Sequence, residues 1–310
     1  MRIFRSLDDI KKDNSCILTT GTFDGVHLGH QSIIKTLHDS VSQDNECVTI
    51  VTFEPHPQFV VKSPKGNGLK LLTTIDEKIS ILQDLKIDRL IIIPFDEKFA
   101  QLSSQQFIEN ILVKRIGFKK IVIGYDHAFG KNRQGNYRIL EQLSKQYNYS
   151  IIMLPAFSLD GVIISSTKIR RLLQNGDVEL AAKYLGRNYL LTGKVIKGEG
   201  RGRSLNIPTA NIEPISSEKL IPKDGIYAVW ARTGDQIYKA VLYIGTKPTF
   251  AFNNRTIEVH IFDFSGDLYD LILKIEFKAR IRDDLYFDRV DKLIEQIELD
   301  KEETLKILET

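Results

Sequence analysis

Two closely spaced histidines are the feature of the sequence with the clearest chemical meaning. His27 and His30 lie in a glycine-rich stretch that begins at Gly21 and also contains Gly29. An imidazole can donate a hydrogen bond to a phosphate oxygen whether it is neutral or protonated. The glycines let a phosphate approach the backbone, and the start of a helix offers free N–H groups and a partial positive charge. This stretch therefore predicts a phosphate-binding site.

The flanking sequence predicts that this stretch joins a strand to a helix. Residues 16–20 are apolar enough for a buried strand, and apolar residues recur at helical spacing over residues 31–41. Ligands of parallel α/β sheets bind where strands end and helices begin. Glycine-rich turns at such places are frequent, but the addition of Phe23, Asp24 and the histidine pair is more specific. The stretch resembles the signature of nucleotidyltransferases, which transfer a nucleotidyl group from a nucleoside triphosphate to a phosphate acceptor.

Two further loops follow predicted strands in the first half of the chain. Residues 52–57 contain two prolines, so this loop is either a rigid turn or a substrate contact. Residues 124–135 combine several glycines with two cations, which suits an anionic ligand. Asp126 in that loop could hold a ribose hydroxyl or a metal, and a solvated loop is an equal alternative.

Residues 165–170 are predicted to begin a helix. The hydroxyls of Ser165, Ser166 and Thr167 most simply cap that helix. Lys168 and Arg170, however, carry positive charges in the first turn, where the helix dipole disfavours positive charge. An anion bound there would relieve the conflict, so we expect a second phosphate contact that faces the histidines.

A glycine- and arginine-rich loop in the second half of the chain is another candidate phosphate site. It begins at Gly198, contains Gly200 and Arg201, and lacks the Gly-Lys-Ser/Thr ending of a Walker A loop. Its backbone could still cradle a phosphate. Thr209 and Asn211 follow the loop and supply neutral oxygens, which Mg²⁺ accepts beside substrate phosphates.

Residues 256–262 alternate between apolar and polar side chains, as expected of a strand with one buried face. Glu258 lies on the polar face together with Thr256 and His260. On an open surface sheet this face would only be solvated. In a small barrel the same face can line a ligand cleft, where a carboxylate could act as a general base.

The spacing of apolar residues divides the chain into two predicted domains, at residues 1–185 and 186–310. In the first, apolar runs alternate with amphipathic stretches, which predicts an α/β doubly wound parallel sheet. In the second, strands follow one another across turns, which predicts an antiparallel β-barrel or sandwich, and a C-terminal helix is expected over residues 288–308. The predicted strands are 16–20, 48–53, 90–93, 121–124 and 151–154, then 189–196, 226–232, 237–244, 256–262 and 271–278.

The composition argues against several classes of protein. Hydrophobic residues make up 42% and charged residues 27%, as in ordinary globular proteins. The net charge of +3 is too mild to indicate a nucleic-acid partner, and no apolar stretch is long enough to span a membrane or act as a signal sequence. Cys16 and Cys47 fall inside predicted strands, so we expect reduced core thiols and neither a disulfide nor a metal pair. The expected location is the cytoplasm.

The motifs of both halves resemble those of the bifunctional bacterial riboflavin kinase/FAD synthetases, in the order that this family uses. Residues 223–227, 244–250 and 258–260 add to the resemblance. It implies that the first domain adenylylates FMN to FAD with release of pyrophosphate. It also implies that the second domain, a six-stranded barrel, phosphorylates riboflavin to FMN. ATP, riboflavin and FMN would be substrates, with Mg²⁺ as cofactor.

The resemblance implies a role for each matching residue. Glu258 would be the catalytic base of the kinase, and Thr209 and Asn211 would form its Mg-ATP motif. His27 and His30 would bind the ATP phosphates of the other reaction. The remaining ATP contacts that it implies are Gly21, Phe23, Asp24, Gly29, Asp126, Ser165, Ser166, Thr167 and Arg170 in the first domain and Gly198, Gly200, Arg201, Pro208 and Thr209 in the second.

Three residues depart from the usual family pattern, namely Asn206, Tyr243 and His127. These departures bear on the affinity for the substrates and on the fit of the flavin, and the class of reaction implied by the resemblance stays the same. A nucleotidyltransferase for another acceptor is one alternative, but it leaves the motifs of the second half unexplained. A barrel that binds flavin without turnover is another, and the joint presence of Glu258, Thr209 and Asn211 argues against it.

Overall fold

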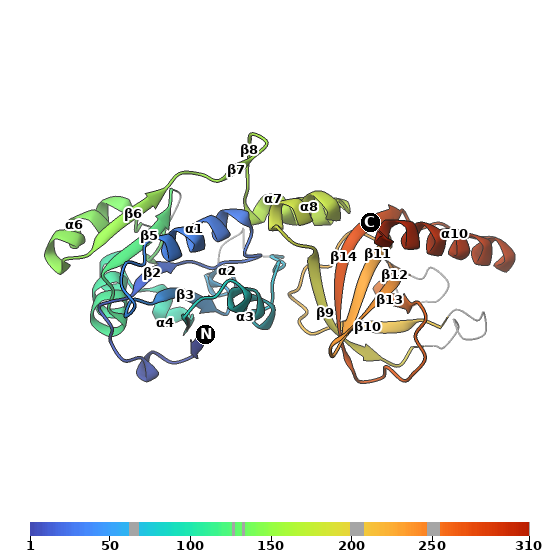
Figure 1. Cartoon of the computed structure of the whole chain (residues 1–310), viewed down its shortest axis with the longest axis horizontal. Helices are drawn as coiled ribbons and strands as arrows, with labels where there is room; N and C mark the ends of the chain where they lie inside the picture. The colour runs from blue at the N-terminus through green and yellow to red at the C-terminus, as the bar shows by residue number, and fades with distance from the viewer. Residues whose placement is uncertain (62–67, 126–127, 132–133, 199–207, 247–254, 310) are drawn as a thin grey trace. The chain divides into compact units, whose positions relative to one another are not determined.

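The chain folds into two compact units, as the computed structural model in Figure 1 shows. The structure describes residues 1–61, 68–125, 128–131, 134–198, 208–246 and 255–309. The first unit comprises Met1–Leu69 and Ile75–Ser165, and the second comprises Lys70–Thr74 and Ser166–Thr310.

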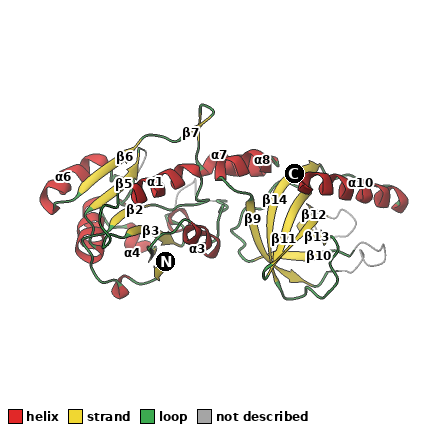
Figure 2. Cartoon of the chain, in the orientation of Figure 1, coloured by secondary structure: helices red, strands yellow, loops and turns green. Residues whose placement is uncertain are grey.

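A parallel sheet forms the centre of the first unit, with strands in the order β1-β4-β3-β2-β5-β6. Figure 2 labels β2, β3, β5 and β6 of this sheet. The strands are β1 (Arg2–Phe4), β2 (Ile17–Thr20), β3 (Val48–Glu54), β4 (Arg89–Pro94), β5 (Lys120–Gly124) and β6 (Ser150–Leu154). From β2 the chain winds to one side through β3 and β4 and later to the other side through β5 and β6. Such a switch point is where ligands of open α/β sheets bind, outside the carboxyl ends of the strands.

Helices cover both faces of this sheet. They are η1 (Leu7–Asp9), α1 (Leu28–Asp39), α2 (Pro57–Val60), α3 (Ile75–Asp84), α4 (Glu97–Ala100), α5 (Ser104–Gln106), the π-helix η2 (Phe107–Ile116) and α6 (Tyr137–Tyr147). A small hairpin of β7 (Ser158–Leu159) and β8 (Val162–Ile163) follows β6.

Alternate residues of the central strands belong to two separate hydrophobic clusters. Leu18 of β2 packs in one cluster with Leu112 and Leu140, from η2 and α6. Ile17 packs in the other with Leu37 of α1 and with residues of α3. The two clusters confirm a doubly wound sheet, and the five strands predicted here lie within one residue of their predicted bounds. The pattern does not predict β1, whose three residues are mostly exposed.

The second unit contains a closed antiparallel barrel, with strands in the order β10-β13-β12-β11-β14-β9. The strands are β9 (Tyr189–Ile196), β10 (Ala210–Pro214), β11 (Gly225–Thr233), β12 (Gln236–Thr246), β13 (Arg255–Ile261) and β14 (Ile272–Arg282). The helices are α7 (Ser166–Asn175), α8 (Val178–Leu185) and α10 (Val290–Glu309). The barrel and its C-terminal helix are confirmed. The sequence analysis misses β10 because its segment reads as a continuation of the preceding loop.

Helices α7 and α8 pack against the barrel, although they precede the predicted boundary at residue 185. The amide of Lys223 donates to the carbonyl of Leu173 at 2.9 Å, and the amide of Arg280 donates to Glu179 Oε1 at 3.3 Å. A short segment before α3 also joins this unit, since Leu71 forms a parallel bridge with Lys219. The compact unit around the barrel therefore begins before the change in sequence periodicity.

The two cysteines form a disulfide, so the prediction of reduced core thiols is wrong. Cys16 lies directly before β2 and Cys47 directly before β3, and the two strands pair with Ile17 opposite Val48. This register brings the Cα atoms of the cysteines to 4.7 Å, within the range that a disulfide spans. The pairing depends on which strands are neighbours, and that is a tertiary property.

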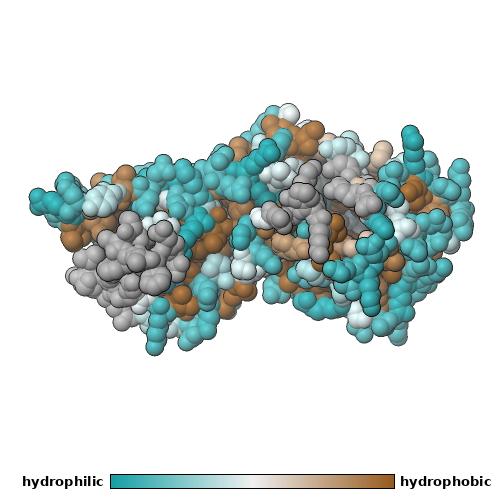
Figure 3. Space-filling model, turned by 180° about the vertical axis from the view of Figure 1, so that it is seen from behind, coloured by the Kyte–Doolittle hydropathy of each residue, from teal (hydrophilic) through white to brown (hydrophobic). Residues whose placement is uncertain are grey.

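The surface agrees with the ordinary composition of the chain. On the face drawn in Figure 3, hydrophilic residues predominate and hydrophobic residues form smaller areas between them. Among the helices that the structure describes, none combines the length and the apolar character needed to cross a membrane.

A buried ion pair fixes α10 to the barrel and leads to a stability prediction. Arg282 of β14 donates to both carboxylate oxygens of Asp300, from Nε at 2.8 Å and from Nη2 at 2.6 Å. Asp300 is only 4% exposed, so Asp300→Ala leaves a largely buried guanidinium without its partner. We expect a loss of about 3 kcal/mol from the stability of the barrel.

Fluorescence of Trp230, the single tryptophan of the chain, is the measurement for this prediction, because it lies in β11 and reports on the barrel. The matched control is Asp288→Ala, which removes an exposed pair with Lys292 and is expected to cost less than about 1 kcal/mol. Equal unfolding midpoints for the two variants would mean that the buried pair does not anchor α10.

Candidate active sites

The loop between β2 and α1 is held in an unusual backbone conformation. Phe23 and Val26 have positive φ angles of 48° and 39°, and Gly25 has 85°. Positive φ is costly for a β-branched residue and persists only where the surroundings enforce it. The side chains of Phe23 and Val26 are 2% and 0% exposed and belong to one of the two clusters of the sheet. The core therefore fixes the course of the loop at the switch point of the sheet.

The two histidines stack against each other at the start of α1. Their ring centroids are 3.7 Å apart, and the planes make an angle of 18°. His27 is the N-cap of α1, and its Nδ1 accepts a hydrogen bond from the amide of His30 at 3.4 Å. An accepting Nδ1 leaves the proton of a neutral imidazole on Nε2. His27 therefore caps the helix through Nδ1, and its Nε2 carries the proton.

Gly29 has a packing role beside this pair. A Cβ atom at this position would lie 3.1 Å from Cε1 and 3.2 Å from Nδ1 of His27. A Cβ atom at Gly21 would lie 3.3 Å from the ring of Phe23. Both glycines thus let an aromatic ring of the loop lie close to the backbone. The approach of a phosphate to this backbone stays a prediction.

A buried lysine lies behind the loop, and the sequence analysis did not identify it. Lys78 of α3 is 5% exposed, and its Nζ donates to the carbonyl of Thr22 at 2.8 Å. Burial lowers the pKa of Lys78, against the charges of Asp24 and Glu54, which act to raise it. A signal for this residue was present, because Lys78 follows Ile75 by one turn on the apolar side of the helix. Asp24 is itself 2% exposed, so this predicted site residue lies in the wall of the site.

The predicted second phosphate contact lies at the start of α7. Ser165 precedes the helix, and Ser166 and Thr167 are its first two residues. The guanidinium Nε of Arg170 donates to the carbonyl of Lys70 at 2.7 Å. These helix residues belong to the second compact unit and the histidines to the first, so their action on one ligand stays a prediction. The predictions for Asp126, His127, Gly200, Arg201 and Asn206 lie outside the described residues.

A second group of predicted residues meets on strands β10 and β13 of the barrel. Asn211 and Glu258 are direct cross-strand partners, and Thr209 Oγ1 donates to Glu258 Oε2 at 3.2 Å. The burial of β13 alternates as predicted, with Ile257 and Val259 buried and Glu258 half-buried. The three polar side chains therefore share the side of the barrel wall that faces away from the core.

Two further contacts surround Thr209, Asn211 and Glu258. A ring nitrogen of His260 lies 2.8 Å from the carbonyl oxygen of Pro208. A Cβ atom at Gly198 would overlap the side-chain amide of Asn211, so glycine is required for the observed packing. Hydroxyl, amide and carboxylate side chains thus occupy neighbouring positions of the barrel, and oxygen donors are the ligands that Mg²⁺ takes.

Tyr243, which departs from the expected family pattern, lies directly beside Glu258. The two residues are cross-strand partners on β12 and β13. The hydroxyl of Tyr243 donates to Asp284 Oδ2 at 3.0 Å. Burial is the main cause that raises the pKa of Tyr243, and the charge of Asp284 adds to it. The phenol is therefore a neutral donor turned toward Asp284.

Comparison with known proteins gives a family match for each half of the chain. Residues 9–168 match the family model described as FAD synthetase, and residues 185–308 match the model described as riboflavin kinase.

Individual relatives match almost the whole chain. A protein of Buchnera aphidicola named "Bifunctional riboflavin kinase/FMN adenylyltransferase" is 38% identical over 97% of each chain. A protein of the same name from Bacillus subtilis is 36% identical over 94% of this chain and 92% of its own. A solved structure titled as a macrolide-efflux protein from Streptococcus pneumoniae covers 98% of both chains, with 29% identity and a TM-score of 0.87. That structure supports the fold, and its titled function stays with that protein.

Proposed function

The chain belongs to the family of bifunctional riboflavin kinase/FMN adenylyltransferases, and from this premise we propose which residues carry each reaction. The protein is an enzyme of FAD biosynthesis that phosphorylates riboflavin to FMN and adenylylates FMN to FAD. Residues 1–185 carry the adenylyl transfer and residues 186–310 carry the kinase reaction. The convergence of Glu258, Thr209 and Asn211 in the barrel is the observation that supports this division best.

In the kinase reaction, Glu258 takes the proton of the riboflavin hydroxyl as its oxygen attacks the γ-phosphorus of ATP. A primary alcohol is a weak nucleophile, so a positioned carboxylate helps. The hydrogen bond from Thr209 to one carboxylate oxygen orients the carboxylate. Gly198 and Pro208 belong to the backbone around the ATP phosphates, with Gly200 and Arg201 between them in the sequence.

The adenylyl transfer needs no general base, because the FMN phosphate is already a nucleophile. It attacks the α-phosphorus of ATP, and pyrophosphate leaves. The requirement is alignment and donors for the charge that develops on phosphate oxygens. His27 and His30 supply such donors, supported by the geometry of the stacked pair and of the N-cap. Ser165, Ser166, Thr167 and Arg170 contact the same ATP, and Asp126 binds its ribose or a metal.

Thr209 and Asn211 fit Mg²⁺ as a cofactor of the kinase, because the Thr209 hydroxyl bonds to the carboxylate of Glu258 and Asn211 is the cross-strand partner of Glu258. A bound Mg²⁺ ion would neutralise charge on the ATP phosphates. We further propose that the enzyme works in the cytoplasm on small molecules, with neither nucleic acid nor a membrane as partner. The mild net charge of +3 supports the absence of a nucleic-acid partner.

Product analysis tests the proposed function directly. The protein is incubated with riboflavin, ATP and Mg²⁺, and the flavins are separated by chromatography. We expect FMN to appear first and FAD to follow. If FAD formed from added FMN but riboflavin gave no FMN, the barrel would bind flavin without turnover, and the proposed kinase residues would be wrong.

A further inference from the structure

The disulfide lies at the end of the sheet opposite to the predicted phosphate site. Cys16 and Cys47 precede the amino ends of β2 and β3, whereas the loop of His27 follows the carboxyl end of β2. The backbones are already joined here, because the amide of Ile17 donates to the carbonyl of Cys47 at 2.9 Å. The two sulfur atoms are therefore kept within bonding range by the sheet itself, whether or not they are bonded.

The two cysteines differ in their exposure to solvent. Cys16 is 0% exposed, whereas Cys47 is half-buried and lines an open cavity of about 840 Å³. Asp13 and Arg89 also line this cavity, and Cys16 does not. Cys47 is thus the cysteine of the pair that borders solvent, whereas Cys16 is enclosed.

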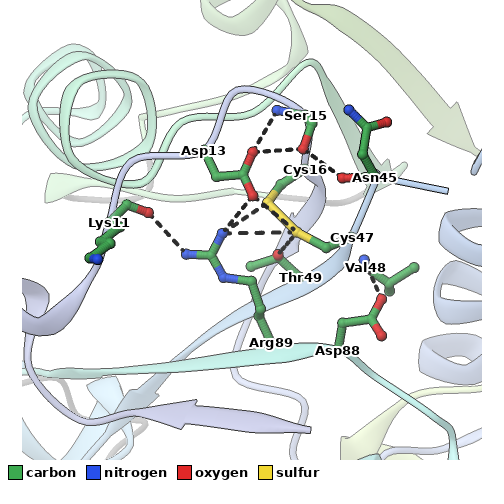
Figure 4. Close-up of a disulfide and its surroundings, with 10 residues drawn as sticks. All are labelled: Lys11, Asp13, Ser15, Cys16, Asn45, Cys47, Val48, Thr49, Asp88 and Arg89. Atoms are coloured by element: carbon green, nitrogen blue, oxygen red, sulfur yellow. Dashed lines mark hydrogen bonds and ion pairs between the residues drawn. A yellow bond between two sulfur atoms is a disulfide. The ribbon is translucent and has the colours of Figure 1, made fainter. Parts of the chain in front are cut away.

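An arginine side chain points at the sulfur pair (Figure 4). Nη1 of Arg89 lies 3.0 Å from Cys16 Sγ and 3.9 Å from Cys47 Sγ. The guanidinium lies over the ring of Phe4 at 5.3 Å, and its Nη2 donates to the carbonyl of Lys11 at 3.5 Å. A fixed cation beside a sulfur stabilises the thiolate form of cysteine.

A metal ion is the alternative occupant, and the same arginine argues against it. Asp13, Cys16 and Cys47 offer ligand atoms within 4.8 Å of one another. The cation of Arg89 already lies against all three, at 3.5 Å from Asp13 Oδ2. Burial acts to raise the pKa of Asp13, but hydrogen bonds from Ser15 and the charge of Arg89 outweigh it, and the pKa is lowered. The carboxylate thus serves as the counter-ion of Arg89.

We propose that Cys16 and Cys47 form a reversible dithiol–disulfide site that exchanges with low-molecular-weight thiols and disulfides through Cys47. In reduction, an external thiolate attacks Cys47 Sγ, and the bond to Cys16 breaks. Its electron pair stays on Cys16 as a thiolate beside Arg89. A second external thiolate then displaces Cys47 from the mixed disulfide. Two thiols become one external disulfide, and the protein gains two electrons and two protons.

Oxidation follows the same path in reverse. The thiolate of Cys47 attacks a glutathione disulfide and releases one glutathione. The thiolate of Cys16 then attacks Cys47 Sγ and releases the second. A sulfur that is a good leaving group speeds such exchange, and Arg89 gives Cys16 that property. Cys47 is assigned as the exchanging cysteine because it is the more exposed of the two, and Cys16 is assigned as the leaving group because Arg89 lies beside its sulfur.

The test uses the reduced full-length protein and oxidised glutathione, followed by intact mass spectrometry. The wild type is expected to lose two hydrogens without keeping glutathione. Cys16→Ser is expected to keep one glutathionyl group, because no second thiol releases it. Cys47→Ser should react about tenfold or more slowly, since the reactivity of a thiol follows its exposure. Equal reaction of the two variants would overturn the assigned roles.

A second measurement needs no substitution and covers the case in which Cys16→Ser fails to fold. The reduced wild type is treated briefly with iodoacetamide and its peptides are mapped. Alkylation is expected at Cys47 about tenfold or more faster than at Cys16. Similar labelling of both cysteines would contradict the proposal. So would a disulfide that persists when the folded protein is treated with dithiothreitol, because that would make it a static crosslink.

Discussion

Replacing Glu258 with glutamine is expected to reduce riboflavin phosphorylation by about 10²–10⁴-fold, because the amide cannot accept the proton of the attacking hydroxyl. Glutamine keeps the size of the side chain and keeps an oxygen that can accept the hydrogen bond from Thr209. The substitution therefore separates the two roles that the structure allows for Glu258. The glutamine variant loses the general base, but it keeps the hydrogen-bond acceptor for Thr209.

The measurement is the rate of FMN formation from riboflavin, with binding of riboflavin and conversion of FMN to FAD measured in parallel. Binding and FAD formation should be close to wild type. Glu276→Gln is the matched control, because Glu276 also lies half-buried on a barrel strand and pairs with Arg232 at 3.5 Å. Near-wild-type FMN formation by Glu258→Gln would remove this residue from the chemistry and leave it a supporting role.

Replacing His30 with alanine is expected to lower FAD formation from FMN by about 10²–10³-fold, the usual effect of removing one donor to developing charge. Riboflavin phosphorylation should persist, since Glu258 and Thr209 belong to the other compact unit. His30→Asn, which retains a donor, should fall between the wild type and the alanine variant. The measurement is a separate assay of each reaction on the same protein preparation.

A second histidine of the same helix provides the control. Nε2 of His38 lies 3.0 Å from the carbonyl oxygen of Leu85, near the other end of α1. His38→Ala therefore removes an imidazole and a packing contact without touching the predicted phosphate site, and FAD formation should change little while the protein stays folded. A loss of both reactions to the same extent in His30→Ala would contradict two separate sites.

Local patterns explain why so much of the fold could be predicted. The alternation of buried and half-buried residues in β13 is visible in the sequence because a strand projects successive side chains to opposite faces. Residues 90–93 of β4 are all apolar and require cover on both faces, and two clusters provide it. The strand β10 escaped prediction because its five residues, among them Asn211 and Pro214, read as a continuation of the preceding loop.

Contacts between segments that lie far apart in the sequence could not be predicted in the same way. The position of Lys78 on the apolar side of its helix suggests burial, but only the fold places its ammonium group 2.8 Å from the carbonyl oxygen of Thr22. The packing of α7 and α8 on the barrel depends on contacts such as Lys223 with Leu173, which no period in the sequence encodes. The disulfide is a further case, because Cys16 and Cys47 meet only through the pairing of β2 with β3.

The sequence by itself determined the two kinds of domain, the glycine-rich turn at His27 and His30, and the polar face around Glu258. These features follow from side-chain period and from local backbone preference, which act over a few residues. Only the tertiary structure decided that Tyr243 stands beside Glu258, that Arg89 faces a sulfur pair, and that Lys78 is buried. Strand order and register set these contacts, and both arise from packing between segments far apart in the chain.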